Sequence, residues 1–286
     1  MKLTQATCAH LYDQRTPYAV SMEESILAIH KSGFKYIDAS VNSMARREDQ
    51  PLCRDDWEQW AYSIRELGEK LGKEFIQAHA FFPTGDARTG VLDDHSSEML
   101  KRTILSASIL GVEYIVIHPL TFPEIGLEEA FHLNCEYLSR WGEFCINHNI
   151  GMAIENMYPH KNEATFGTTP EVLLEIVNRI NDPRVGICLD TGHANLTKLD
   201  IPETIRKIGP HLKATHISDN KGIKDDHTVP FAGKIDWPPV IKALKEINYE
   251  HGFTFEVHKF PYFYPASLQQ DLIDFTFKLG NYLINL

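Results

Sequence analysis

The chain has 286 residues, of which 43% are hydrophobic, and its 28 basic and 39 acidic side chains give a net charge of −11. This apolar fraction excludes disorder as the main state and is sufficient for one large domain. No run approaches the roughly 18 consecutive apolar residues of a membrane-spanning helix, and the start lacks the apolar segment of a secretory signal. The acidic balance argues against a broad duplex nucleic-acid surface, which needs a basic face.

The cysteine pattern predicts neither a disulfide framework nor a zinc-ribbon site. The five cysteines, Cys8, Cys53, Cys135, Cys145 and Cys188, are odd in number and form no CxxC pair. Each is interpreted as a small core residue, and a reducing cytoplasm is the expected compartment.

Eight short apolar runs alternate with longer segments of helical character. The expected strands are Leu3–Thr7, Lys35–Ala39, Glu74–Ala78, Tyr114–Ile117, Gly151–Ile154, Val185–Leu189, Leu212–Thr215 and Gly252–Phe255. Helix signals follow each strand, such as the spacing of Ser21 and Glu24, which is typical of a capping box. Apolar residues recur at three- and four-residue intervals in Leu127–Ile146 and Leu268–Leu283, as expected of helices.

This alternation predicts an α/β fold, a single-domain (β/α)8 TIM barrel spanning residues 1–286, because each unit has roughly 36 residues. A doubly wound open sheet is the competing architecture. The GxGxxG motif that usually marks it is absent, since CAHLYDQ follows the first strand.

Six consecutive expected strands end in histidine, aspartate or glutamate. These residues are His79, His118, Glu155, Asp190, His216 and Glu256. In a parallel barrel such positions meet at one rim, where barrel enzymes hold their active sites. Carboxylate oxygens and imidazole nitrogens suit Mn²⁺, Zn²⁺, Co²⁺ or Fe²⁺. A lone strand-end aspartate is more often a helix N-cap, so the metal interpretation depends on the whole set.

The segments GMAIEN, CLDTGHAN and HISDNKGIKDDHTVPFAGKIDW resemble the sugar phosphate isomerase/epimerase family of the xylose isomerase-like TIM barrels, a superfamily that includes endonuclease IV. The resemblance extends over most of the chain. It implies, by match to the one-metal ketose 3-epimerases, that one divalent ion is held by Glu155, Asp190, His216 and Glu256. Mn²⁺ or Zn²⁺ is the first expectation and Co²⁺ or Mg²⁺ the alternative. The implied partner is a sugar or sugar phosphate, and a homodimer or homotetramer is a family-based expectation.

The implied reaction moves a proton at a carbon next to a ketose carbonyl through a metal-bound enediolate. Glu155 and Glu256 are the expected acid/base pair, in which one takes the proton and the other returns one. The expected substrate contacts are His193, His118, His79, His227 and Lys221. The same residues would serve a dehydratase or lyase acting on a polyol or cyclic acid, and a non-catalytic sugar-binding barrel is a further alternative.

Endonuclease IV supplies another alternative, because it holds three zinc ions with five histidines, two aspartates and two glutamates. The chain has a candidate for each of these nine ligands. The candidates for binding ions beyond the first are Asp225, His227, His193, His79 and His118. Such a cluster would favour phosphodiester hydrolysis of abasic DNA. The net charge of −11 favours the sugar enzyme, so nucleic acid is not the expected partner.

The loop after His216 departs from the epimerase pattern, because it contains Lys221 and Lys224 but no arginine. Lysine is a mobile point charge rather than a planar fork, so an equivalent role does not follow. Lys259 is a candidate for facing a phosphate or carboxylate. Aromatic residues expected at the rim, for stacking on sugar or for loop packing, are Phe81, Phe82, Phe122, Tyr158, Phe166, Phe231, Tyr262, Phe263 and Tyr264. His10, His160 and His258 are further candidate substrate contacts.

Overall fold

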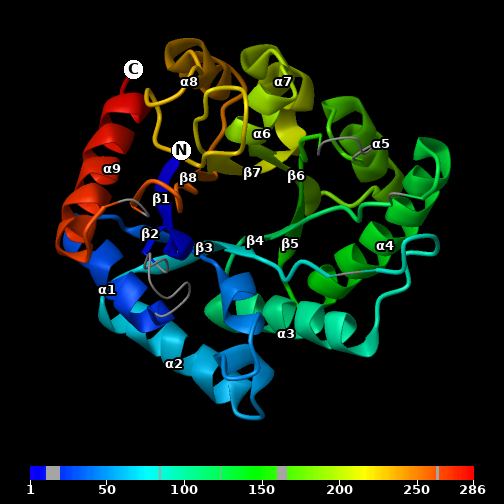
Figure 1. Ribbon diagram of the computed structural model, residues 1–286, viewed down its shortest axis with the longest axis horizontal. Helices are drawn as coiled ribbons and strands as arrows, with labels where there is room; N and C mark the ends of the chain where they lie inside the picture. Colours follow the sequence, from blue (N-terminus) through cyan, green and yellow to red (C-terminus); the bar gives the residue numbers. More distant parts are fainter. Residues whose placement is uncertain (11–19, 84, 123, 160–165, 262–263) are drawn as a thin grey trace.

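The computed structural model describes residues 1–10, 20–83, 85–122, 124–159, 166–261 and 264–286. Eight parallel strands pair in chain order and close into a barrel, because the first strand also pairs with the last. Figure 1 looks along this barrel and shows the helices as a ring around the strands. The chain is therefore a single-domain TIM barrel, as predicted.

All eight expected strands are confirmed, with ends that move by at most two residues. They are β1 (Lys2–Ala6), β2 (Tyr36–Ala39), β3 (Glu74–His79), β4 (Tyr114–Ile117), β5 (Gly151–Glu155), β6 (Val185–Asp190), β7 (Leu212–Ile217) and β8 (Gly252–Phe255). Parallel strands are covered on both faces, which explains the apolar runs of strands such as β4 (YIVI) and β8 (GFTF).

The helices follow the strands as predicted. They are α1 (Met22–Ser32), α2 (Trp57–Lys70), α3 (Asp94–Leu110), α4 (Leu127–Asn147), α5 (Pro170–Ile180), α6 (Thr191–Leu196), α7 (Ile201–Ile208), α8 (Trp237–Glu246) and α9 (Gln269–Ile284), with short 3-10 turns η1 (Thr7–His10), η2 (Val41–Ala45), η3 (Pro51–Cys53), η4 (Gly209–His211) and η6 (Ala266–Leu268). The capping box of α1 is confirmed, since the Glu24 amide donates to Ser21 Oγ at 3.2 Å and the Ser21 amide donates to the Glu24 carboxylate at 2.9 Å. Within the described ranges, no helix combines the length and the apolar character needed to cross a bilayer.

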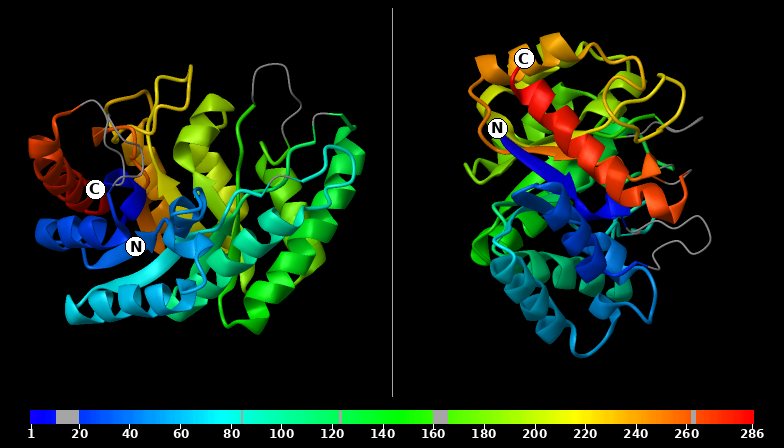
Figure 2. Two further views of the ribbon diagram at one scale, coloured as in Figure 1. Left: turned by 60° about the horizontal axis from the view of Figure 1, so that its bottom comes forward. Right: turned by 90° about the vertical axis from the view of Figure 1, so that its left-hand side faces the viewer.

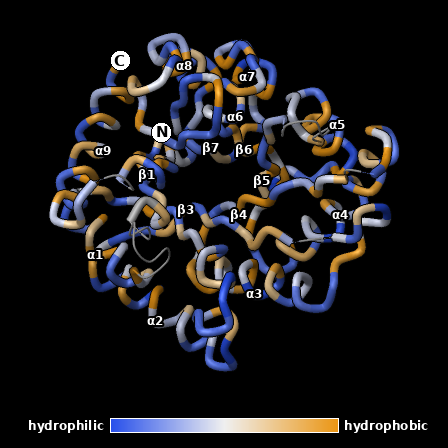
Figure 3. The backbone as a smooth tube through the Cα atoms, viewed as in Figure 1, coloured by the Kyte–Doolittle hydropathy of each residue, from blue (hydrophilic) through white to orange (hydrophobic). Residues whose placement is uncertain are grey.

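The core has two layers. The larger layer fills the space between strands and helices, and hydrophobic residues recur at intervals along the helices to form it (Figure 3). The inner layer, within the barrel, is built from the small side chains of Val116, Ala153, Cys188 and Ala214. Small residues here leave room for polar groups above them. The side views show the long loops gathered at one end of the barrel, the connection after β7 among them (Figure 2).

Candidate metal and substrate site

The six strand-end residues predicted from the sequence meet at the carboxyl end of the barrel. His79, Glu155 and Asp190 are the last residues of β3, β5 and β6, while His118 and Glu256 directly follow β4 and β8. Each strand thus carries its polar side chain to the rim. Glu155, Asp190, His216 and Glu256 each place one donor atom within 4.8 Å of the others. The structure therefore brings together the four residues expected to hold one ion.

Glu155 is the centre of the site floor. Its Oε2 lies 2.9 Å from His118 Nε2 and 3.1 Å from His79 Nε2. Its Oε1 lies 3.1 Å from His216 Nδ1 and 3.4 Å from His193 Nδ1. Burial by itself raises the pKa of Glu155, but the positive potential of His216 and His118 holds it well below its usual range. The neighbouring histidines therefore favour the carboxylate form of Glu155 against the effect of its burial.

Glu256 also faces His216 Nδ1, but from a more exposed position. Its Oε2 lies 3.4 Å from His216 Nδ1 and 3.5 Å from His227 Nδ1, and 15% of its side chain is exposed. Burial raises the pKa of Glu256, and the nearby charge of Glu155 adds to this, against the opposite effect of His216 and His227. The two glutamates thus titrate in opposite directions, as the members of acid/base pairs do.

Among the residues that the structure describes, three buried ligand atoms of the floor find no hydrogen-bond partner, namely Asp190 Oδ2 and both ring nitrogens of His216. A buried polar atom left in this state costs about 1–3 kcal/mol. The other oxygen, Asp190 Oδ1, accepts from the His193 amide at 2.7 Å, so Asp190 also caps α6. The unpartnered oxygen and nitrogen, together with the two glutamates, form a donor set that fits a divalent ion.

Backbone carbonyls orient two of the histidines. His79 Nδ1 donates to the Ala80 carbonyl at 3.0 Å, and His193 Nδ1 donates to the Asn156 carbonyl at 2.8 Å. A bond from Nδ1 to a carbonyl is how metal-binding histidines are usually held. In His193 it leaves Nε2 as the ligating nitrogen, whereas Nε2 of His79 faces the Glu155 carboxylate.

Further groups of donor atoms adjoin the first. Three of them are His79, His118 and Glu155; His79, His216 and Glu256; and Asp190, His193 and His227.

Asp225 lies beside the last of these groups, with Oδ2 at 2.8 Å from His227 Nε2 and Oδ1 at 4.0 Å from His193 Nε2. Burial lowers the pKa of His227, but its hydrogen bond with Asp225 raises it to about 9. All nine residues expected for a multi-ion site are thus close together.

A cavity of about 320 Å³ opens above the floor. Its volume is at the lower end of the roughly 300–1,000 Å³ typical of small-molecule pockets. Four of the expected substrate contacts line it, namely His79, His118, His193 and His227. The fifth, Lys221, is exposed in the loop after β7 and does not contribute to the lining. Lys259 Nζ lies 3.2 Å from Asp225 Oδ2, so its partner in this structure is a carboxylate of the protein.

The aromatic residues expected at the rim have different surroundings. Phe231 and Tyr264 are exposed, and Phe81 is partly buried against the core. Phe82 and Tyr158 line the cavity, whereas Phe122 and Phe166 are buried in the core. His258 lines the cavity as a candidate contact. His160, Tyr262 and Phe263 lie outside the described residues.

The sequence analysis did not predict the part of the cavity lining that comes from the segments following β1 and β2. Ser40, Asn42, Ser43 and Arg46 line the cavity there, as does Cys8, which was expected only as a core residue. The Arg46 guanidinium lies 5.1 Å from the centre of the Phe82 ring. The polar run SVNSMAR after the second strand was an available signal. It was overlooked because no His, Asp or Glu ends that strand.

Asp38 is a second residue that the sequence analysis missed. Its Oδ2 lies 3.6 Å from His216 Nε2 and accepts a hydrogen bond from Gln77 Nε2 at 2.8 Å. A carboxylate behind a ligand imidazole orients the ring and increases its basicity. At 3.6 Å the two atoms do not form a hydrogen bond, so Asp38 is a candidate for positioning His216 once they approach each other more closely.

The sequence matches the family described as xylose isomerase-like TIM barrel over residues 26–279. The chain belongs to this family. Among curated relatives, the y4fM protein of Sinorhizobium fredii is 32% identical over 164 residues, 56% of this chain and 51% of that one. D-psicose 3-epimerase of Enterocloster bolteae is 30% identical over 123 residues, 43% of this chain and 38% of the epimerase. These alignments therefore span about half or less of the relatives' length.

Solved structures confirm the fold. A D-tagatose 3-epimerase-like protein superimposes with a TM-score of 0.76 and 23% identity, covering 100% of this chain and 98% of that one. The IolI protein, in a structure with a bound zinc atom, gives a TM-score of 0.76 and 22% identity over 99% of this chain and 98% of its own. At these identities the likeness concerns the barrel itself.

Proposed function

We propose that this xylose isomerase-like barrel is a metal-dependent sugar isomerase or epimerase that moves a proton at a carbon next to a ketose carbonyl. One observation carries the proposal. Glu155 and Glu256 approach the same nitrogen, His216 Nδ1, at 3.1 and 3.4 Å on the floor of a small cavity. Two carboxylates beside one binding position can serve one substrate carbon, as a proton donor and a proton acceptor.

Glu155, Asp190, His216 and Glu256 would hold one divalent ion, with Mn²⁺ or Zn²⁺ as the first expectation. When bound, such an ion withdraws electrons from a carbonyl and makes the neighbouring C–H more acidic. The unpartnered Asp190 Oδ2 and His216 Nδ1 support this assignment.

The residues around the cavity have separate tasks. Glu155 and Glu256 form the acid/base pair, in which one takes the proton and the other returns one, and their pKa values are shifted in opposite directions. His118 and His193 are placed on the wall to hydrogen-bond sugar hydroxyls. Phe82 and Tyr158 present ring faces to the C–H groups of a sugar and exclude water from the reacting carbon.

The test begins with protein purified without added metal or chelator. Elemental analysis is expected to find about one divalent ion per chain. The protein is then incubated in heavy water with a panel of ketoses and their phosphates, and nuclear magnetic resonance follows deuterium uptake. We expect uptake at one carbon of a true substrate, loss of uptake after chelation and recovery on adding Mn²⁺ or Zn²⁺. Sugar binding without any exchange by metal-loaded protein would contradict an isomerase.

A multi-ion phosphodiesterase is the second candidate, favoured by the adjoining donor groups. Two or three zinc ions per chain and cleavage of abasic duplex DNA would support it. Replacing Asp225 or His227 by alanine separates the two candidates, because a one-ion enzyme should lose little metal and a multi-ion enzyme should lose much. The net charge of −11 makes the sugar enzyme the preferred function.

A further inference from the structure

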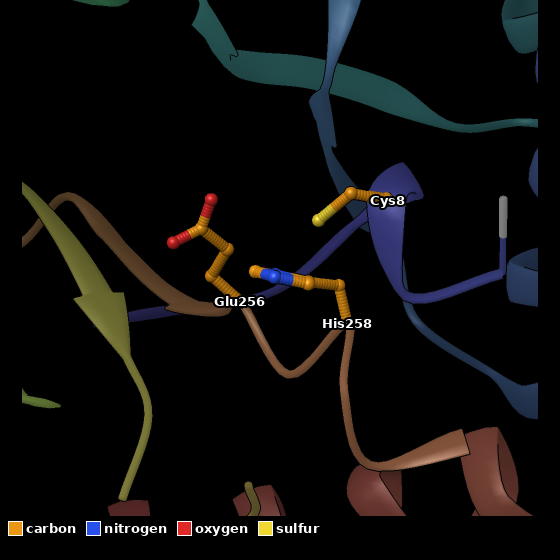
Figure 4. A group of neighbouring side chains, drawn as sticks. All are labelled: Cys8, Glu256 and His258. Carbon is orange, nitrogen blue, oxygen red and sulfur yellow. The ribbon is translucent and has the colours of Figure 1, made fainter. Parts of the chain in front are cut away.

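The cavity wall after β1 carries a thiol for which the proposed reaction has no use. Cys8 lies in η1, and only 7% of it is exposed. Figure 4 shows that Cys8, Glu256 and His258 extend toward one another, from η1 and from the segment after β8. One donor atom from each of the three side chains lies within 4.8 Å of the others.

We propose that Cys8, His258 and Glu256 form a second metal site, which binds a thiophilic divalent ion such as Zn²⁺ and shares Glu256 with the four-ligand site. One sulfur, one nitrogen and one carboxylate oxygen are a ligand set for zinc, with the fourth position open to the cavity. Zinc bonds of about 2.0–2.3 Å separate tetrahedral ligands by roughly 3.3–3.8 Å, so the side chains need to close by at most about 1.5 Å.

The backbone around Cys8 is held in place. Its amide donates to Ser40 Oγ at 3.0 Å, and the Ser40 amide donates to Thr7 Oγ1 at 2.9 Å. These two bonds fasten η1 to the end of β2, so the thiol is presented to the cavity from a fixed position. Burial raises the pKa of Cys8 well above its usual range, so binding of a cation would release the thiol proton.

His258 is held by stacking, because its ring centre lies 4.1 Å from that of His227. The positive charges of His227, Lys259 and Arg46 act on the same ring. They oppose a cation at this position, so we expect the second site to bind more weakly than the four-ligand site. A thiolate and a carboxylate together still neutralise the two charges of the ion.

Sharing Glu256 has a consequence that rests on the proposed function, whereas binding itself does not. An ion held by Cys8 and His258 would also hold a carboxyl group of the acid/base pair. Excess zinc should therefore inhibit proton exchange without displacing the first ion.

Cobalt provides a direct probe of the site, because a thiolate bound to Co²⁺ gives a charge-transfer band in the near ultraviolet. Chelator-treated full-length protein is titrated with Co²⁺. We expect no such band with the first equivalent, which binds oxygen and nitrogen, and a band with the second. Absence of the band at any cobalt content would overturn the proposal.

Variants assign the band to its ligands. Cys8→Ser should abolish the charge-transfer band. His258→Gln should lower the affinity for the second equivalent of Co²⁺ at least about tenfold, while the first equivalent still binds. Cys135→Ser, on α4 and away from the cavity, is the matched control and should keep the band. Circular dichroism checks that each variant is folded. A band that persists in Cys8→Ser, or that disappears equally in Cys135→Ser, would overturn the assignment.

The same samples separate the two proposals. If no ketose exchanges deuterium but the cobalt band appears and depends on Cys8, the proposed function fails and the second site stands. If exchange occurs and the band is missing, the second site fails and the function stands. If both hold, zinc inhibition should be relieved at least about tenfold in Cys8→Ser, since one of three ligands is lost.

Discussion

Glu155 and Glu256 occupy matching places at the ends of β5 and β8, yet their surroundings differ. Glu155 is 1% exposed and lies within 3.4 Å of four histidine nitrogens. Glu256 has 15% of its side chain exposed and faces the open cavity beside Cys8 and His258.

This difference decides how the two carboxyl groups titrate. Histidines hold the pKa of Glu155 low despite its burial, whereas burial next to another carboxylate raises the pKa of Glu256. The same residue type at equivalent barrel positions therefore has its pKa lowered at one place and raised at another. Environment, rather than residue identity, sets these shifts.

The most severe change should be Glu155→Gln. Glu155 is buried and lies within 3.4 Å of four histidine nitrogens, so glutamine there removes a ligand and also the negative charge that these rings face. We expect metal content to fall to near zero and deuterium exchange to fall by at least roughly 10²–10⁴-fold. Elemental analysis and the exchange assay measure the two effects. Glu113→Gln is the control, because Glu113 pairs with Lys2 and His251 and precedes β4. Normal metal content and exchange in Glu155→Gln would remove Glu155 from its central role.

Glu256→Gln should separate chemistry from metal binding. Glu155, Asp190 and His216 remain as three protein ligands, which is the usual number for a catalytic ion. We expect exchange to fall by roughly 10²–10⁴-fold, while much of the metal is retained. Measuring both on the same preparation is the test. Equal metal loss in the two glutamine variants would show that the contrast between the glutamates has no functional meaning.

Asp38→Asn should have an intermediate effect, since Asp38 lies behind His216 without joining the donor group. Loss of such a carboxylate typically lowers metal affinity by about 10–100-fold. Competition with a chromogenic chelator measures the affinity. Exchange at saturating metal should remain close to that of the wild type, which distinguishes a positioning residue from a ligand. Unchanged affinity would contradict this role.

The smallest effect concerns the metal-free protein and its dependence on pH. Burial lowers the pKa of His227 and Asp225 raises it to about 9, above the unfolded value of about 6.5. A raised folded-state pKa stabilises the fold below the unfolded pKa, and this contribution disappears as pH rises through about 9. For this one residue it is on the order of 3 kcal/mol.

Asp225→Asn should therefore flatten the decline in unfolding free energy between about pH 6.5 and 9. Urea unfolding of chelator-treated protein at several pH values checks this. Lys224→Gln, which changes an exposed residue of the same loop, is the control. Identical pH profiles for Asp225→Asn and the wild type would show that Asp225 does not set the charge of His227.

Much of the site was predictable from the sequence because of one property of parallel barrels. The carboxyl ends of all eight strands meet at the same rim, so Asp190 and His216 could be placed side by side before any distance was known. Lys221 shows the limit of this reasoning. A loop residue close in sequence to the rim does not have to point into the cavity, and this one is exposed.

The sequence by itself determined the barrel and the ring of polar residues at its rim. Both depend on local patterns, namely apolar runs, helix starts and polar residues at strand ends. Only the tertiary structure decided the opposite titration of Glu155 and Glu256, the position of Asp38 behind His216 and the meeting of Cys8 with His258. These features depend on contacts between residues distant in the chain, and the pairwise electrostatics of buried groups change steeply with distance. Folding therefore converts a predictable set of residues into a site with assigned roles.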